Sequence, residues 1–494
     1  MLAIVNGSIL DAEAAAPSDA TVLIEAGRIA DILPAGAPIP AQAERFDATD
    51  RLVIPGLVNA HTHGHGNLMK GVGDRWTLEI SLVNGPWASG RRDPEQKYLS
   101  ALAGAVEMLA KGVTACYDLV YEHPVPSVEG LQAIAQAYHD AGIRAVVCPM
   151  IADRSFYEAI PGLADSLPPD LRAEVRSFRM APVEQTLAAV ETVMRNWRWP
   201  RERVAPAVAP TIPMHCTEGL MARCIELAGE YGTGIQMHLA ESKVQVEAAA
   251  IVYGQTLAQY VDRIGLASPR FAAAHAVWLD ADDYRRLADK GCQFIHIPGS
   301  NYRLGSGVAC ARLMVDSGAT VALATDGATS SDNLNLFEIM RLAAMTSRAL
   351  GEPHERWLTS REVFSMATRG GAKVMGMEDT IGKLAPGYAA DLVCLDLASF
   401  NYMPLNDALN QIVNCEDGTG VRDVMVDGRW VVRDRTVLTT DVPALRRKLQ
   451  AAADAARAAA IPVQAQVARL TPHVAAFART LIERPNALKR YVLR

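Results

Sequence analysis

The stretch that decides the fold is residues 53–63, VIPGLVNAHTH. An apolar run interrupted by Pro55-Gly56 ends on His61, and His63 follows two positions later. Residues two apart on a strand project to the same face, so the two imidazoles can bind one metal ion. In a (β/α)8 barrel the active site lies at the carboxyl ends of the strands, where this pair would stand. An H-x-H pair alone is weak evidence, so the interpretation depends on the rest of the chain.

Seven more strand-like runs follow, with helical patterns between them. The runs are 113–119, 144–150, 203–210, 234–240, 270–275, 292–297 and 320–326, and helical spacing is clear over 99–111, 129–141 and 217–231. Strands that alternate with helices predict an α/β fold with a parallel sheet and crossover connections. The count of eight strands predicts closure into a TIM-like (β/α)8 barrel. An open doubly wound sheet is the alternative.

The two ends of the chain depart from this alternating pattern. Both contain short β-rich pieces with Gly and Pro turns, and such segments on either side of a barrel can pair with each other. We therefore predict a small β-sandwich domain from residues 1–57 and 381–440, around a barrel of residues 58–380. The Ala- and Arg-rich remainder, 441–494, predicts a helical C-terminal tail with a break at Pro462.

The composition narrows the classes of protein to which the chain can belong. Half of the 494 residues are apolar and 21% are charged, as in a folded globular protein. The net charge of -7 argues against a nucleic-acid-binding surface. No apolar run approaches the ~18 residues of a membrane span, and the N-terminus lacks a signal peptide's features. Eight scattered cysteines without a C-x-x-C pair fit a cytoplasmic protein with buried free thiols.

Three further residues with metal-ligating side chains end predicted strands. His238, His275 and Asp326 each follow an apolar run, and so they join the first two histidines at one barrel rim. Imidazole and carboxylate suit Zn²⁺ or Fe²⁺. A two-metal centre would need a bridging ligand, often a carboxylated lysine late in the fourth strand, and residues 203–210 contain no lysine. We therefore predict one divalent metal ion per chain, Zn²⁺ first and Fe²⁺ second.

Glu241 stands three residues beyond His238. A carboxylate beside an activated water can take its proton and pass it to a leaving group. Asp326 could share that work while it contacts the metal. The alternative is that Glu241 is a solvated carboxylate of a loop.

Together these motifs resemble the amidohydrolase superfamily, specifically its cytosine deaminase/chlorohydrolase-like branch. The similar stretches are 55–63 (PGLVNAHTH), 237–241 (MHLAE), 298–307 (PGSNYRLGSG), 325–328 (TDGA) and 382–392 (GKLAPGYAADL). The resemblance covers roughly residues 1–440 and implies a metal-dependent barrel with a composite β-sandwich. It implies four metal ligands, His61, His63, His238 and Asp326. It also implies that Glu241 and His275 handle protons or polarise the substrate, with His275 touching the metal only weakly.

Departures from the family pattern bear on the substrate. Nucleoside deaminases of this branch tend to carry an acidic, ribose-binding residue late in the segment after H-x-H, where this chain has Ser89 or Gly90. Their fourth strand is often followed by A-P-H-A-P, whereas this chain continues with Thr211-Ile212-Pro213. A nucleoside substrate is therefore disfavoured.

The candidate substrate contacts form a separate set. Trp76, Trp87 and Lys70 lie in the long connection after the first barrel strand, where substrate loops belong. Aromatic rings there could stack on a flat heterocycle, although lid packing would use them equally well. Two more candidates, His215 and His296, lie near the predicted rim.

The sequence predicts a metal-dependent hydrolase of non-peptide C–N bonds. We expect an aminohydrolase, or deaminase, that acts on a small nitrogen heterocycle or an amidine-like carbon. One alternative keeps this site but cleaves a carbon–halogen, urea or carbamate bond. Another is a non-catalytic binding barrel, but such proteins typically lose ligands and this chain keeps the whole set. The expected partners are a small-molecule substrate and further copies of the chain, in a dimer or tetramer.

Overall fold

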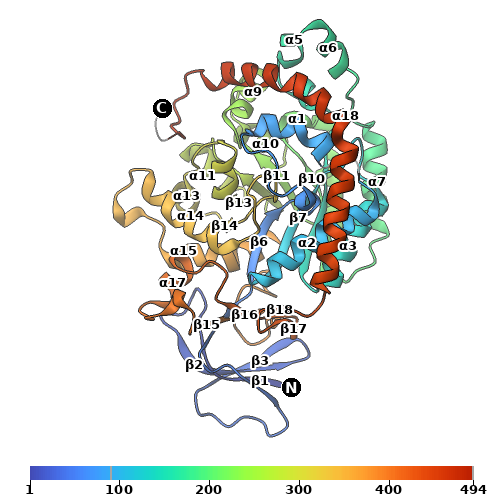
Figure 1. The fold of residues 1–494 in the computed structure, drawn as a ribbon. Helices are drawn as coiled ribbons and strands as arrows, with labels where there is room; N and C mark the ends of the chain where they lie inside the picture. The colour runs from blue at the N-terminus through green and yellow to red at the C-terminus, as the bar shows by residue number, and fades with distance from the viewer. Residues whose placement is uncertain (89–91, 492–494) are drawn as a thin grey trace.

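The computed structural model describes residues 1–88 and 92–491, and its central feature is a ring of parallel strands (Figure 1). The strands are β6 (Leu57–Thr62), β7 (Val113–Val120), β8 (Arg144–Ile151), the short pair β9 (Val204–Pro206) and β10 (Ala209–Pro210), β11 (Ile235–Leu239), β12 (Phe271–His275), β13 (Gln293–His296) and β14 (Val321–Leu323). Nearly all of their residues are buried, which explains why they form continuous apolar runs in the sequence.

Hydrogen bonds join the two halves of this ring. One half has the order β10-β8-β7-β6 and the other β11-β12-β13-β14. At one seam the Gln236 amide donates to the Val208 carbonyl at 3.2 Å. At the other seam the Asp326 amide donates to the His61 carbonyl at 3.1 Å. The eight-stranded TIM-like barrel is thus confirmed, and the open doubly wound sheet is excluded.

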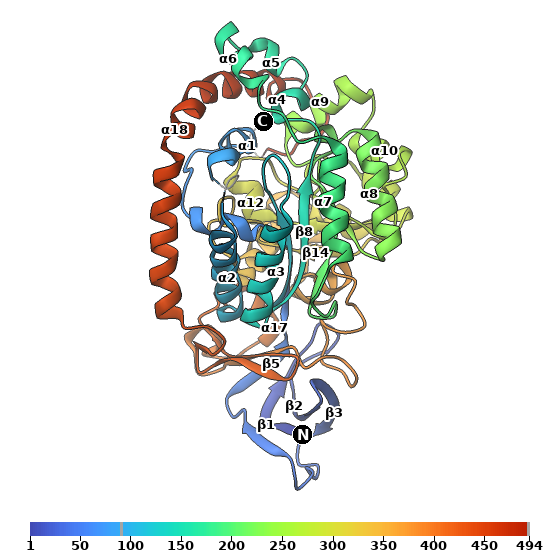
Figure 2. The ribbon, with the colours of Figure 1, turned by 90° about the vertical axis from the view of Figure 1, so that its right-hand side faces the viewer.

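Helices surround the barrel (Figures 1 and 2). They are α1 (Leu78–Ala88), α2 (Pro94–Ala110), α3 (Val128–Ala141), α4 (Phe156–Ala159), α5 (Leu163–Ser166), α6 (Pro169–Val175), α7 (Val183–Arg195), α8 (Glu218–Tyr231), α9 (Lys243–Tyr253), α10 (Leu257–Arg263), α11 (Ala281–Asp289), α12 (Pro298–Arg303), α13 (Ala311–Asp316), α14 (Leu336–Ala349), α15 (Ser360–Ser365), α16 (Gly371–Val374) and α17 (Ala408–Asn414). Local signals set their ends: Ser127 caps α3 by accepting from the Gly130 amide, and Gly142 ends it at φ 80°.

Strands from both ends of the chain form one nine-stranded sheet at the base of the barrel (Figure 2). Its members are β1 (Leu2–Ile9), β2 (Ser18–Glu25), β3 (Arg28–Pro34), β4 (Glu44–Asp47), β5 (Arg51–Pro55), β15 (Leu392–Asp396), β16 (Val421–Val426), β17 (Arg429–Arg433) and β18 (Thr436–Val437). The two ends of the chain meet where β5 pairs antiparallel with β15. The exact domain boundaries stay a prediction.

Gly56 is the crossing point between this sheet and the barrel. A Cβ there would stand 2.0 Å from Thr114 Oγ1, so only glycine lets β5 continue directly into β6. A buried ion pair also joins the barrel to the small sheet near Gly56, because Arg144 Nε lies 2.7 Å from Asp391 Oδ2. The carboxyl ends of the barrel strands consequently lie on the side away from the small sheet.

The tail contains a single long helix, α18 (Val442–Ile482). The predicted break at Pro462 is wrong, because the helix continues through Pro462 and Pro472. A proline removes only one backbone donor, and packing on both sides of it can keep a bent helix intact. The helix bends over the end of the barrel opposite the small sheet (Figure 1). Among the described residues, none of the helices has the length and apolar character that a bilayer crossing requires. All eight cysteines are free, and seven of them are buried.

Candidate active site

The five predicted metal-site residues meet at the carboxyl end of the barrel. His61 is in β6, His238 is in β11, and His275 ends β12, while His63 and Asp326 follow β6 and β14. His275 and Asp326 have φ angles of 68° and 64°, a left-handed backbone that is strained for residues other than glycine. Such strain persists where the surroundings fix it, and it is typical of functional sites.

The ligand atoms point at one another. His63 Nε2 lies 3.1 Å from Asp326 Oδ1 and 3.4 Å from His238 Nε2, and His61 Nε2 lies 3.6 Å from the same Asp326 oxygen. The Nε2 atoms of His61 and His275 are buried and have no hydrogen-bond partner within the described part of the chain. Unpartnered buried nitrogens beside a carboxylate fit a divalent metal ion, which would satisfy them together.

The other ring nitrogen of each histidine faces an acceptor. The acceptors are Gln236 Oε1 for His61 (2.5 Å), the Leu119 carbonyl for His63 (2.7 Å), the Thr211 carbonyl for His238 (2.9 Å) and Asn301 Oδ1 for His275 (2.9 Å). Each Nδ1 therefore carries the proton, and each Nε2 presents its lone pair to the centre. Such outer contacts fix the ring orientation and the tautomer of metal-binding histidines.

Burial and mutual repulsion favour the neutral forms of His61 and His238, whereas the neighbouring Asp326 outweighs the effect of burial on His63 and raises its pKa. Burial and the nearby His63 lower the pKa of His238 to about 3, and burial holds the pKa of His61 well below its ordinary value. Burial opposes ionisation of Asp326, but His63 outweighs it and holds the pKa of Asp326 well below its usual range. Ser300 Oγ also donates to Asp326 Oδ2 at 2.6 Å. Neutral imidazoles and an ionised carboxylate are the forms that bind a metal.

Glu241 projects from the loop after β11 and is only 2% exposed. Its Oε2 lies 3.8 Å from His275 Nε2 and has no hydrogen-bond partner among the residues described. Burial, together with the charges of Asp326 and Glu79, raises the pKa of Glu241 well above its ordinary value. A carboxyl group with a raised pKa can both accept and return a proton near neutral pH. The alternative of a solvated loop carboxylate is therefore wrong.

A cavity of about 200 Å³ opens onto this centre, and most of its wall is apolar. Trp76 and His215 line it, as the sequence predicted for substrate contacts. Burial lowers the pKa of His215 to about 4, so its ring is neutral. The sequence missed several other lining residues: Leu78, Ser81 and Leu82 on α1, and Tyr121, Met150, Arg154, Phe156, Met180 and Thr329 on the other sides.

Three of the predicted substrate contacts lie elsewhere. Lys70 is half-exposed, and its ammonium pairs with Glu107, because this carboxylate lies on the neighbouring helix α2. Trp87 packs edge-on against Trp76 at 6.0 Å and donates to Asn84, so it supports the wall without lining it. His296 is fully buried, and it does not border the cavity. Ser89 and Gly90 lie outside the described residues.

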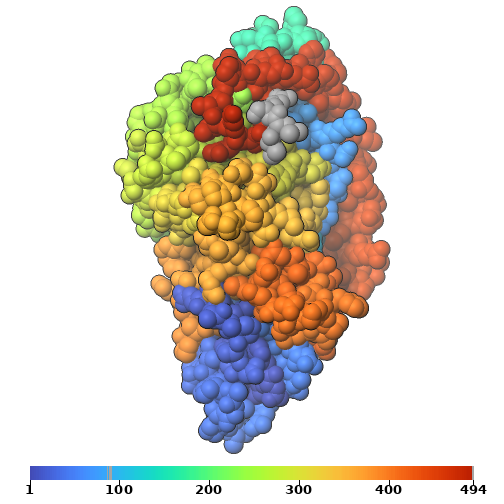
Figure 3. Space-filling view, turned by 90° about the vertical axis from the view of Figure 1, so that its left-hand side faces the viewer, coloured from blue at the N-terminus to red at the C-terminus, as the bar shows by residue number. Residues whose placement is uncertain are grey.

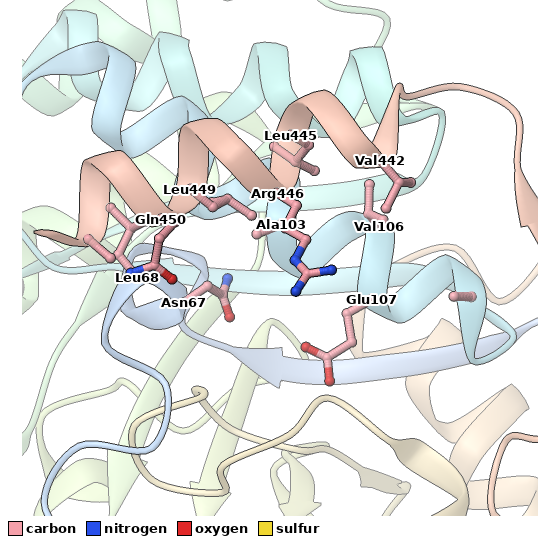
Figure 4. Close-up of a pocket in the computed structure, with 12 residues that line it drawn as sticks. Asn67, Leu68, Ala103, Val106, Glu107, Val442, Leu445, Arg446, Leu449 and Gln450 are labelled. Atoms are coloured by element: carbon pink, nitrogen blue, oxygen red, sulfur yellow. The ribbon is translucent and has the colours of Figure 1, made fainter.

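A second hollow of about 380 Å³ lies between α18 and α2, next to the 3-10 helix η1 (Gly64–Met69) (Figure 4). Its wall is mostly apolar, with Leu445 and Leu449 of α18 facing Val106 of α2. The residues that line it include none of the metal-site cluster. It is therefore separate from the cavity that faces Glu241.

Comparisons with known proteins place the chain in a family. The model of the Amidohydrolase family matches residues 52–431. A 5'-deoxyadenosine deaminase from Methanothermobacter thermautotrophicus is 31% identical over 84% of this chain and 89% of that protein. A 5-methylthioadenosine/S-adenosylhomocysteine deaminase from Symbiobacterium thermophilum is 33% identical over 88% of this chain and 94% of that protein. The chain therefore belongs to the amidohydrolase family, and the predicted class of enzyme, a hydrolase, is confirmed.

Solved structures agree with the fold. An adenosine deaminase from Xanthomonas campestris with bound zinc has a TM-score of 0.80 and 26% identity, over 92% of this chain and 98% of that chain. Atrazine chlorohydrolase from Arthrobacter aurescens, in complex with zinc, has a TM-score of 0.82 and 24% identity, over 92% of this chain and 100% of that chain. At 24% identity, the similarity to the chlorohydrolase supports the fold alone. The donor set and the zinc-bound adenosine deaminase together support a site for a divalent metal.

Proposed function

We propose that the chain is an aminohydrolase that removes an exocyclic amine from a small nitrogen heterocycle, with one Zn²⁺ ion per chain and Fe²⁺ as the second choice. The observation that carries this proposal is the position of Glu241, a buried carboxyl group between the histidine cluster and an apolar cavity. The deaminase names of the relatives support the same class of reaction.

The residues divide the work as follows. His61, His63, His238 and Asp326 would hold the metal, which when bound supplies Lewis-acid activation of a water molecule. Glu241 Oε2 accepts a proton from the water and returns it to the leaving nitrogen. A C–O bond forms, the C–N bond breaks and ammonia leaves. His275, oriented by Asn301, presents Nε2 3.8 Å from Glu241 Oε2 and polarises the reacting atoms.

The substrate proposal is a free heterocyclic base. Glu241 and Asp326 are the carboxylates that line the cavity within the described chain, and both belong to the metal centre. A ribose would bury hydroxyl groups without a carboxylate partner, at about 1–3 kcal/mol for each unsatisfied group. The names of the nucleoside-deaminating relatives point the other way. We expect kcat/KM at least ~100-fold lower on adenosine-type compounds than on the best free base.

The test is a product assay across aminated and halogenated heterocycles, ureas, carbamates and nucleosides. We expect ammonia release from a free ring with an exocyclic amine. Chloride release, or cleavage of a urea or carbamate, as the main activity would replace deamination by the alternative reaction. Adenosine or S-adenosylhomocysteine turned over as fast as the best free base would contradict the substrate proposal.

Glu241→Gln tests the mechanism. Glutamine keeps the shape of the side chain but cannot accept the proton, so turnover should fall about 10²- to 10⁴-fold while the metal is retained. Metal analysis of the same samples should give about one ion per chain, and two would contradict the mononuclear site. Unchanged turnover would transfer the proton-transfer role to Asp326 or His275. A cytoplasmic location and a homodimer or homotetramer remain part of this proposal.

A further inference from the structure

The C-terminal tail, residues 483–491, lies over the loops that follow two residues of the active site. After α18 ends, the tail runs along the molecule near α9 (Figure 1), and Arg490 binds the loop after β12. Figure 3 shows it in dark red on the surface, next to the light-green and yellow segments of the barrel. It therefore connects the far end of the sequence to the neighbourhood of Glu241 and His275.

Arg490 is the buried anchor of this tail, with 8% of its surface exposed. Its Nε donates to the Val277 carbonyl at 2.8 Å, and its Nη2 donates to the Leu279 carbonyl. Its own carbonyl accepts a hydrogen bond from the Val308 amide at 2.7 Å. One guanidinium group thus holds the loop that begins two residues after His275.

The turn at the start of that loop has a strained backbone, which its contacts must stabilise. His275 and Ala276 are both in the left-handed region, with φ angles of 68° and 47°, a backbone that is strained for residues other than glycine. The Ala276 amide donates to the Leu239 carbonyl at 3.0 Å, and Tyr284 Oη donates to the Ala276 carbonyl at 2.6 Å. The contacts of Arg490 extend this set of constraints to the next two carbonyl groups of the turn.

The loop that carries Glu241 is tied to the same place. Lys243, two residues after Glu241, donates from Nζ to the Ile482 carbonyl at 2.7 Å and to the Arg484 carbonyl. Its ammonium lies 6.0 Å from the Trp278 ring, which in turn contacts the Tyr491 ring at 5.2 Å. The end of α18 and the tail therefore fasten both catalytic loops side by side.

We propose that Arg490 is a positioning residue for the reaction and acts through His275. By holding the carbonyl groups of Val277 and Leu279, it keeps His275 Nε2 directed at the centre, 3.8 Å from Glu241 Oε2. This inference rests on the proposed function for its kinetic part. An ordinary structural role for the tail would change stability without a specific effect on turnover.

The test compares three single variants of the metal-loaded enzyme. Arg490→Met keeps the apolar stem and removes both donors, Arg490→Lys restores one donor, and Lys489→Met is the matched control at the neighbouring exposed cation. We expect Arg490→Met to lower kcat about 10- to 100-fold with KM within about twofold, because small misplacements of catalytic groups have effects of this size. Arg490→Lys should recover part of kcat, and Lys489→Met should match the wild type.

A double variant and a second readout make the result decisive. In a His275→Asn background, Arg490→Met should cause no further loss of kcat, whereas a full multiplicative loss would overturn action through His275. Hydrogen exchange at the amides of residues 276–279 should be faster in Arg490→Met than in Lys489→Met, and equal exchange would overturn the proposal. Because exchange needs no substrate, an enzyme without aminohydrolase activity would refute the proposed function separately.

Discussion

Gln236→Leu is the substitution whose effect on the metal site follows most directly from the structure. Gln236 is fully buried in β11, and its Oε1 accepts a hydrogen bond from His61 Nδ1 at 2.5 Å. Its Nε2 donates to the Ala60 carbonyl at 3.1 Å, which fixes the amide orientation. Leucine fills similar space but leaves the His61 N–H without an acceptor.

The size of the effect can be worked out from that single lost acceptor. A buried N–H without a partner costs about 1–3 kcal/mol, and the proton can then move to Nε2, where it blocks the metal. Loss of an outer contact of this kind typically weakens metal binding about 10- to 100-fold. Since a tenfold change in affinity corresponds to about 1.4 kcal/mol, the two estimates agree.

The assay is competition for Zn²⁺ against a chelator at fixed pH. Gln293→Leu is the control, because Gln293 is also buried on a barrel strand but donates to the Pro269 carbonyl, away from the histidines. Both variants should lose some stability, but only Gln236→Leu should lose metal affinity. Equal affinities in the two variants would refute the reasoning that Gln236 fixes the tautomer of His61.

Two further predictions concern stability. Arg144→Met should lower the free energy of unfolding by about 3–5 kcal/mol, because it leaves the buried Asp391 carboxylate without its charge partner. The double variant Arg144→Met/Asp391→Leu should recover most of that loss, as measured by urea titration. The second concerns the loss of stability in acid. Burial lowers the pKa of His215 to about 4, below the ~6.5 of a histidine in an unfolded chain. The contribution of neutral His215 to the free energy of unfolding is therefore present above pH ~6.5 and is lost as the pH falls towards 4. His215→Gln should therefore lose less stability between pH 7 and pH 5 in urea titrations, and an unchanged slope would contradict a neutral His215.

The barrel could be predicted because its strands are buried on both faces. Continuous apolar runs such as 113–119 and 270–275 therefore stand out, and β7 and β12 occupy almost the same residues. The metal-site residues could be predicted for a related reason, since polar side chains that end apolar strands meet at one rim. Pro462 could not be interpreted in this way, because a proline breaks an isolated helix and the burial of the following turns of α18 is invisible in the sequence.

The pocket was harder to predict than the metal centre. The connection after β6 has no periodicity, so nothing in the sequence distinguished Trp76, which lines the cavity, from Trp87, which packs behind it. Lys70 looked available for a substrate because its partner Glu107 is 37 residues away in the chain. Gln236 did carry a signal that was overlooked: it is a polar residue in an apolar strand, two positions before His238 and so on the same face.

These differences follow from how the site is built. The barrel strands place the ligand side chains, and the outer contacts of these side chains come from neighbouring strands and the residues after them: the Leu119 and Thr211 carbonyls and the Gln236 side-chain amide. The substrate cavity instead depends on α1 and on loops whose positions are fixed by distant segments. Ser242, next to Glu241, donates to Glu79 on α1 at 2.8 Å, and Lys243 then holds the end of α18. Changes in the C-terminal segment can therefore alter substrate handling and turnover while the metal ligands stay the same.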